Sequence, residues 1–239
     1  RYMFLNLTKL ILSFFDLLDR KKILSYFKRN IKHQLKCFID VGAHHGESIK
    51  SFNKVFKIER IIAFEASSKN FEILSDKNKD IKNLKIYNVG LGEKEETLNF
   101  KQHVESQSST LAKINDQSNY YKRKNFYLNF FNKNKIQFHE VKVKVERLDN
   151  ILNSLKIQHV DILKIDTEGY EFKVIKGAKD KIKDIRYIYF EHHFDDMLQK
   201  NYSFSNIHDY LTKNGFTKQF KVKMFFRKTF EYIYQNSKI

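Results

Sequence analysis

The segment that most constrains this fold is a short apolar run, residues 37–41, followed by two glycines, Gly42 and Gly46. Helical spacing of apolar residues resumes from Ser48, so the pattern predicts a strand, a tight turn and a helix. Glycines let the backbone approach a ligand closely, and the first turn of a helix offers free N–H groups. The turn therefore suits a nucleotide-like cofactor at the carboxyl end of a first strand, with a purely structural turn as the alternative.

The spacing of the two glycines is G-x-x-x-G and not the G-x-G-x-x-G of dinucleotide folds. Asp40, at the end of the strand, would repel a pyrophosphate but could hold an ammonium group. An NAD-dependent oxidoreductase is therefore disfavoured. A second apolar segment ends in Glu65, about twenty residues beyond the glycines, where a carboxylate can accept ribose hydroxyls. The alternative for Glu65 is a solvated charge at the end of a strand.

Short apolar strands and helical segments alternate along most of the chain, which predicts an α/β fold. Alternation at 98–100 and 141–145 predicts an antiparallel pair within it. Helices are expected at about 48–56, from Ser67-Ser68 onward and near 207–211. Further strands are expected at 60–65, 84–89, 160–166 and 186–191, and the last two strands within 216–226.

Four motifs in this order resemble the FkbM-type methyltransferases: Asp40-Val41-Gly42-Ala43 with Gly46, Ala63-Phe64-Glu65-Ala66, Asn88-Val89-Gly90-Leu91-Gly92, and Lys164-Ile165-Asp166-Thr167-Glu168-Gly169-Tyr170-Glu171. The resemblance covers about residues 38–194, and His44-His45 departs from the family pattern, which more usually has Asn first. It implies a class I S-adenosylmethionine-dependent enzyme that methylates hydroxyl groups, often on sugars or natural products. It also implies a Rossmann-like, seven-stranded, mostly parallel sheet with an antiparallel last strand and helices on both faces.

The cofactor implied by the resemblance is S-adenosyl-L-methionine, and the turn chemistry and the motifs together indicate its site. Ser109 is included because a Ser-Ser-Leu-like run lies beside the cofactor in the family. The expected cofactor-binding residues are Asp40, Gly42, Ala43, His44, Gly46, Glu65, Ala66, Asn88, Gly90, Ser109 and Asp166.

The expected catalytic residues are Asp166, Glu168 and His192, which follow two neighbouring strands at their carboxyl ends. Methyl transfer to a hydroxyl needs a base that removes the proton as the oxygen attacks, and a carboxylate or histidine is suited to this. Alternatively, Asp166 only holds the turn and Glu168 caps a helix. No metal is expected, although Asp166, Glu191 and His192 form a less favoured set of ligands for a divalent ion.

The net charge of +17 is concentrated outside the motifs, beginning with residues 1–36, which carry nine basic and two acidic side chains. We expect a basic, amphipathic helical extension at 1–36 and a methyltransferase domain at 37–239 with an insertion at 101–140. The insertion is expected to form a lid or substrate site, and the alternative is a mobile surface loop with no role. Specific nucleic-acid binding is not expected, and without proline the proline-containing motifs of DNA methyltransferases cannot occur. The expected acceptor is a small molecule or glycan.

Charged residues interrupt the apolar run of the extension too often for it to span a bilayer. The extension packs on the domain or over the cofactor site, or else lies on an anionic membrane surface. The expected location is the cytoplasm; in the second of these two arrangements the protein also contacts the inner face of the membrane. A non-catalytic membrane- or polyanion-binding module on the same fold is the alternative function.

Overall fold

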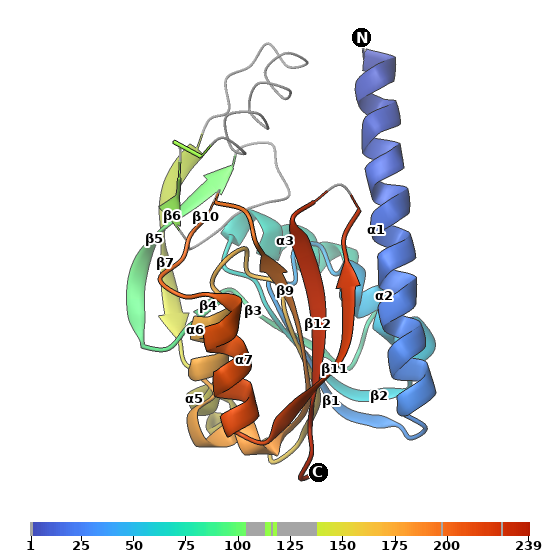
Figure 1. Ribbon diagram of the computed structural model, residues 1–239, viewed down its shortest axis with the longest axis vertical. Helices are drawn as coiled ribbons and strands as arrows, with labels where there is room; N and C mark the ends of the chain where they lie inside the picture. Colours follow the sequence, from blue (N-terminus) through green and yellow to red (C-terminus); the bar gives the residue numbers. More distant parts are fainter. Residues whose placement is uncertain (1, 104–112, 116, 119–137, 197, 226) are drawn as a thin grey trace.

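The computed structural model describes residues 2–103, 113–115, 117–118, 138–196, 198–225 and 227–239. This part of the chain is built on a seven-stranded sheet with the order β11-β12-β9-β8-β1-β2-β3 (Figure 1). Only β12 runs in the direction opposite to the other six strands, so the predicted fold class is confirmed. The strands are β1 (Leu35–Val41), β2 (Ile58–Phe64), β3 (Leu84–Tyr87), β8 (Val160–Ile165), β9 (Ile185–His193), β11 (Phe216–Lys223) and β12 (Thr229–Asn236).

The prediction that the last two strands lie within 216–226 is wrong. Only β11 lies there, and β12 begins at Thr229. The reason is burial: β12 is inserted between β9 and β11, so Tyr232, Ile233 and Tyr234 are each at most 1% exposed. A strand that is covered on both faces needs an unbroken apolar run, and such a run is found near the end of the chain rather than before Phe226.

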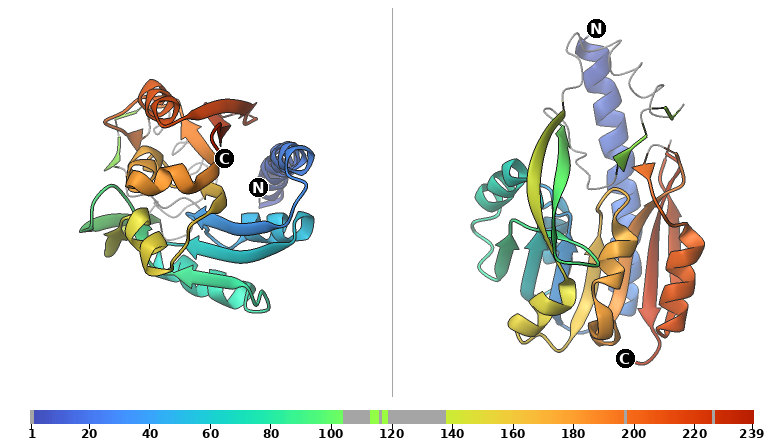
Figure 2. Two further views of the ribbon diagram at one scale, coloured as in Figure 1. Left: turned by 90° about the horizontal axis from the view of Figure 1, so that it is seen from below. Right: turned by 90° about the vertical axis from the view of Figure 1, so that its left-hand side faces the viewer.

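Helices cover both faces of the sheet (Figure 2). The predicted start of α3 at Ser67-Ser68 is confirmed, because the Ser67 hydroxyl accepts a hydrogen bond from the Asn70 N–H, as an N-cap should. One face carries α1 (Tyr2–Asn30), α2 (Glu47–Val55) and α3 (Ser68–Lys77). The other carries α5 (Leu148–Ser154), α6 (Glu171–Lys176), the 3-10 helix η1 (Lys179–Asp184) and α7 (Phe204–Lys213).

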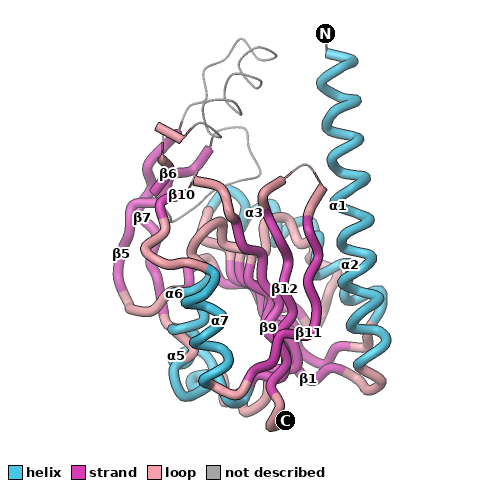
Figure 3. The backbone as a smooth tube through the Cα atoms, in the orientation of Figure 1, coloured by secondary structure: helices cyan, strands magenta, loops and turns pink. Residues whose placement is uncertain are grey.

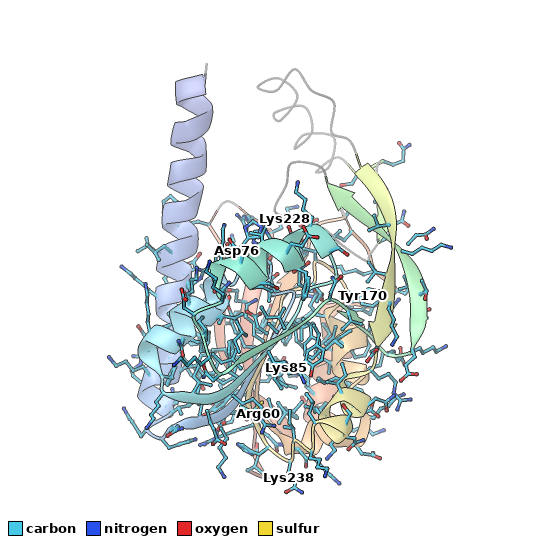
Figure 4. All side chains as sticks on the ribbon, turned by 180° about the vertical axis from the view of Figure 1, so that it is seen from behind. Arg60, Asp76, Lys85, Tyr170, Lys228 and Lys238 are labelled. Atoms are coloured by element: carbon cyan, nitrogen blue, oxygen red, sulfur yellow. The ribbon has the colours of Figure 1, made fainter. Side chains whose placement is uncertain are left out.

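The N-terminal segment forms a single helix, α1, whose second half is part of the core. Ile23 and Phe27 are at most 1% exposed, and the Phe27 ring packs 5.5 Å from that of Tyr187. The first half extends beyond the rest of the described molecule (Figure 4). None of the described helices is long and apolar enough to cross a membrane. The division of the chain at residue 36 stays a prediction.

Two smaller sheets lie beside the main one (Figure 3). The predicted antiparallel pair is confirmed, with Leu98 opposite Val143. Most of the predicted insertion 101–140, including Ser109, lies outside the described residues, so its role as a lid stays a prediction. The sheets combine β4 (Gly90–Leu91), β5 (Glu96–His103) and β7 (Phe138–Glu146), and β6 (Lys113–Ile114) with β10 (Leu198–Gln199).

Candidate active site

A cleft of about 490 Å³ opens at the carboxyl ends of β1, β2 and β8. Its volume falls within the roughly 300–1,000 Å³ that is usual for ligand sites, and open α/β sheets bind ligands at this edge. The structure brings together eight of the predicted site residues in its lining. These are Gly42, Ala43, His44, Glu65, Ala66, Gly90, Asp166 and Glu168.

The glycine turn brings the backbone of β1 against that of β8. Gly42 has a φ of +76°, and a Cβ there would lie 1.9 Å from the carbonyl oxygen of Asp166. Gly46 has a φ of +87° and precedes α2, and its Cβ would lie 2.5 Å from the Asn78 side chain. Both positions therefore require glycine, but only Gly42 lines the cleft, whereas Gly46 shapes the turn behind it.

Glu65 is fixed at the end of β2 by backbone donors. The N–H of His44 donates to its Oε2 at 2.8 Å, and the N–H of Ser67 donates to its Oε1 at 2.9 Å. Burial raises the pKa of this carboxyl, which is 6% exposed, although the two N–H groups act in the opposite direction. The side chain of Asn88 donates to the carbonyl oxygens of Glu65 (2.8 Å) and Ala66 (3.3 Å), so it supports the loop and does not line the cleft.

The departure at His44-His45 gives the turn an unusual set of side chains. The two imidazole rings stack with centroids 3.6 Å apart, and Glu47 Oε2 lies 3.4 Å from His44 Nδ1. Burial would raise the pKa of Glu47, but its bonds to His44 and to its own backbone and the two histidine charges lower it to about 2. One possible metal-ligand atom from each of His44, His45 and Glu47 lies within 4.8 Å of the other two. Imidazole nitrogens and carboxylate oxygens are among the ligands that zinc takes in proteins.

Asp40 does not reach the cleft itself but acts through Lys164. It is fully buried, and Lys164 Nζ donates to its Oδ1 at 2.9 Å while lying 3.5 Å from Asp166 Oδ2. Burial raises the pKa of Asp40 and Lys164 opposes this rise. Burial lowers the pKa of Lys164, but Asp40 and Asp166 raise it more, so it stays above its ordinary value. Asp40 therefore positions the ammonium group that holds Asp166.

Glu168 connects the cleft to a buried group of ionisable residues on β9. It follows β8 with a φ of +51°, and its Oε2 lies 3.0 Å from His193 Nε2, which is also 3.1 Å from Glu191 Oε1. Burial, followed by the Asp166 charge, raises the pKa of Glu191 to about 8. Burial lowers the pKa of His193, but Asp195, Glu168 and Glu191 raise it well above its ordinary value. This group can accept and hold protons near neutral pH.

His192, which the sequence proposes as a base, is not brought to the cleft. Successive strand residues point to opposite faces of a sheet, so His192 lies on the α7 side of β9 while His193 lies beside Glu168. The His192 ring packs against the rings of Phe194 (4.8 Å) and Phe204 (5.7 Å). Burial lowers its pKa to about 3. For the same reason, the structure does not bring together the set Asp166, Glu191 and His192 considered for a divalent ion.

Comparison with known proteins decides the family. The family model for the methyltransferase FkbM domain matches residues 40–218, which is most of the chain. This chain belongs to the FkbM methyltransferase family. No curated protein matches it significantly in sequence.

Solved structures agree with this assignment at the level of the fold. The FkbM methyltransferase from Methylobacillus flagellatus KT is 17% identical with a TM-score of 0.52, covering 84% of this chain but only 44% of that one. The chain thus spans less than half of that FkbM protein. M. capricolum TrmK, in complex with S-adenosyl-homocysteine, is 8% identical with a TM-score of 0.50, covering 90% of this chain and 67% of its own.

The cleft also contains residues that the sequence analysis missed. Leu17 and Arg20 of α1 line it, although both lie before the range that the FkbM model matches. No sequence pattern links them to the motifs, because only the packing of α1 brings them there. The position of His193, in contrast, could have been predicted from the sequence. Tyr187 and Tyr189 share one face of β9, and continuing the alternation places residue 193 on that face and residue 192 on the other.

Proposed function

We propose that this FkbM-family chain transfers a methyl group from S-adenosylmethionine to a hydroxyl group. The observation that carries the proposal is one cleft that combines the strained glycine turn, Glu65, and the two acids Asp166 and Glu168. Glycines bring backbone donors close to a ligand, and a carboxylate at the tip of the second strand suits a ribose. Acids at the next strand end suit a reacting centre.

In this proposal the cofactor lies along the carboxyl edge of the sheet. Its ribose hydroxyls bond to Glu65, and its adenine lies against Ala66 and Gly90, which line the same end of the cleft. Its methionyl part extends over Gly42 toward Asp166, whose carboxylate accepts the ammonium group. The positively charged sulfonium then lies between these two ends, within reach of the acids at the end of β8.

The reaction we propose is a direct displacement. The acceptor oxygen attacks the sulfonium methyl carbon, the carbon–sulfur bond breaks to leave S-adenosyl-homocysteine, and the hydroxyl proton passes to a base. Glu168 is the proposed base because it lines the cleft and contacts His193. His193 and Glu191 are positioning residues: His193 holds the Glu168 carboxylate in place, Glu191 holds His193, and His193 rather than His192 is the histidine beside the base.

The acceptor we propose is a sugar, a glycan or a related small molecule that carries a hydroxyl group. The resemblance to FkbM enzymes supports this class. The segments that carry the motifs have balanced charge, which does not favour a nucleic acid. TrmK shares the fold, but a likeness at this low identity does not transfer its substrate.

Binding of the cofactor is the first test. Calorimetry should give micromolar affinity for S-adenosylmethionine and no heat with NAD. Glu65→Gln should weaken S-adenosylmethionine binding about tenfold or more, because a bond to a charged acceptor contributes about 1.5–3 kcal/mol. The matched control is Glu72→Gln on the exposed side of α3. Absence of S-adenosylmethionine binding by folded wild-type protein would overturn the proposal.

The base is tested with labelled S-adenosylmethionine and a panel of hydroxylated sugars. Glu168→Gln should lower the rate of transfer about 10²- to 10⁴-fold while leaving cofactor affinity within a few-fold. His193→Asn should lower the rate as well, and it should shift the pH profile. His192→Asn is the control, and it should change the rate least. A larger effect at His192 than at His193 would contradict our assignment.

A second function rests on the basic N-terminal helix, and we propose it only as peripheral contact with an anionic membrane. The first half of α1 extends away from the sheet and carries apolar residues at helical spacing. Sedimentation with phosphatidylserine vesicles should pull down the wild type, whereas Leu7→Glu with Leu10→Glu should stay in solution. Equal sedimentation of both proteins would remove the membrane from the proposal.

A further inference from the structure

The N-terminal helix borders the proposed cofactor cleft directly. Leu17 and Arg20, one helical turn apart, line the same cleft as Gly42, Glu65 and Asp166. In Figure 1, α1 rises along the sheet and passes the edge where the parallel strands end. Neither residue belongs to the range 40–218 that the family model matches. A segment outside the matched domain therefore contributes side chains to the site.

The position of Arg20 on this helix is fixed by buried neighbours. The preceding residue, Asp19, is 1% exposed and accepts a hydrogen bond from Lys22 Nζ at 2.7 Å. One turn further on, Ile23 is 1% exposed, and Phe27 is fully buried in the core. Earlier in the helix, the Phe15 ring stacks 4.3 Å from that of Phe225. Arg20 is thus presented from a turn that is anchored on both sides.

Of the two cationic side chains that line the cleft, only Arg20 is not already paired with an acid in the described parts of the chain. The other cationic side chain in the lining, Lys164, is bound to Asp40 and faces Asp166 at 3.5 Å. Arg20 is half-buried and makes no hydrogen bond or ion pair with any residue in the described parts of the chain. A guanidinium keeps its charge and presents a planar fork that matches a carboxylate. Such a group in a ligand cleft is suited to an anionic part of the ligand.

The position of Arg20 along the cleft indicates which part of the ligand it faces. The charge of Arg20 lowers the pKa of Lys164, as burial does, although Asp40 and Asp166 raise this pKa more strongly. Arg20 therefore lies close enough to the β8 end of the cleft to interact electrostatically with Lys164. Glu65, the proposed ribose ligand, stands at the β2 end. With the ribose there, the amino-acid part of the cofactor extends toward Arg20 and Asp166.

We propose that Arg20 binds the carboxylate of the methionyl part of S-adenosylmethionine, opposite Asp166, which holds the ammonium group. This inference rests on the proposed function. The two charges of the amino-acid part then meet one cation and one anion of the cleft. Leu17, which is 48% exposed in the free protein, covers the apolar methylene groups next to them. In this proposal α1, which precedes the matched domain, contributes two side chains to the cofactor site.

The test compares two ligands on three proteins by calorimetry. S-adenosylmethionine carries the carboxylate, and 5′-methylthioadenosine keeps the nucleoside and sulfur but lacks the amino-acid part. Arg20→Gln should weaken S-adenosylmethionine binding about 10- to 100-fold and change 5′-methylthioadenosine binding by less than about twofold. Arg29→Gln is the matched control, an exposed arginine of the same helix that should change neither affinity. Arg20→Lys should lose only part of the affinity.

The outcomes are distinguishable. Unchanged S-adenosylmethionine binding in Arg20→Gln would overturn the role of Arg20 and leave the proposed function standing. An equal loss for both ligands would overturn it as well, since Arg20 would then shape the nucleoside part of the cleft. Failure of the folded wild type to bind either compound would overturn the proposed function and this inference together. An unchanged unfolding midpoint shows that Arg20→Gln is folded.

Discussion

Replacing Lys164 with methionine should reveal what the buried Asp40–Lys164 pair contributes to stability. Methionine keeps much of the apolar volume of the lysine stem, so the main change is loss of the ammonium group 2.9 Å from Asp40. Asp40 has no exposed surface, and Lys164 is only 5% exposed. Removing one partner of such a pair costs about 3–5 kcal/mol, because the other charge stays buried without compensation. The pair Lys176–Glu93, at 2.6 Å and with side chains 30% and 32% exposed, is the more solvated control, and Lys176→Met should cost no more than about 1 kcal/mol.

The pH dependence of the free energy of unfolding shows whether an unpaired buried charge causes the destabilisation of Lys164→Met. Burial already raises the pKa of Asp40, and loss of Lys164 raises it further. The folded variant therefore binds a proton at a pH where the unfolded chain, with an Asp pKa of about 3.9, does not. Its free energy of unfolding rises as pH falls through that range, so the deficit relative to the wild type should shrink between pH 7.5 and 5.5. Asp40→Asn combined with Lys164→Met leaves no buried charge and should recover part of the loss.

The assay is urea unfolding followed by far-ultraviolet circular dichroism, since the chain has 13 tyrosines and no tryptophan to report by fluorescence. A cost for Lys164→Met below about 1 kcal/mol at pH 7.5 would refute the reasoning. So would a cost of the expected size that does not change with pH, because lost packing rather than an unpaired charge would then explain it.

Three further predictions concern other parts of the molecule. Burial and Asp166 raise the pKa of Glu191 to about 8, so the stability it contributes is complete below the unfolded value of about 4.3 and is lost as pH rises toward 8. Urea unfolding of Glu191→Gln should therefore vary less between pH 5 and 8 than that of the wild type. Phe27→Ala should cost about 3–5 kcal/mol in the same assay, and Leu17→Ala, on the same helix but 48% exposed, about 0.5 kcal/mol or less. Gly42→Ala should lower the thermal midpoint and abolish cofactor binding in calorimetry, because its Cβ would lie 1.9 Å from the carbonyl oxygen of Asp166.

Most of the fold could be predicted because local sequence patterns reflect local structure. The strands that end at Val41, Phe64 and Ile165 lie in a parallel sheet that is covered on both faces, so each is mostly apolar and contains only two charged residues. The N-cap at Ser67 could be predicted as well, since a cap depends on residues within one helical turn. The position of β12 could not, because its place between β9 and β11 is a property of the sheet and not of the segment.

The candidate site likewise contains some residues that could be placed from the sequence and others that could not. Gly42, Glu65 and Asp166 lie at strand ends, and parallel strands bring such residues to one edge, so the sequence could place them together. The choice between His192 and His193 depends on the phase of the alternation along β9, and only the position of His193 beside Glu168 settles it. The function of Asp40 was only partly predictable, since its contact with Lys164 joins residues 124 positions apart in the chain.

The sequence by itself determined the sheet, the glycine turn and the family, because these depend on residue types at short and regular spacings. The tertiary structure decided which side chains meet. Arg20 reaches the cleft only because Ile23 and Phe27 anchor α1 in the core, far along the chain from the motifs. Glu191 acquires its raised pKa only because β9 is buried next to Asp166. Burial and proximity between distant segments are properties of the folded chain, and no local pattern encodes them.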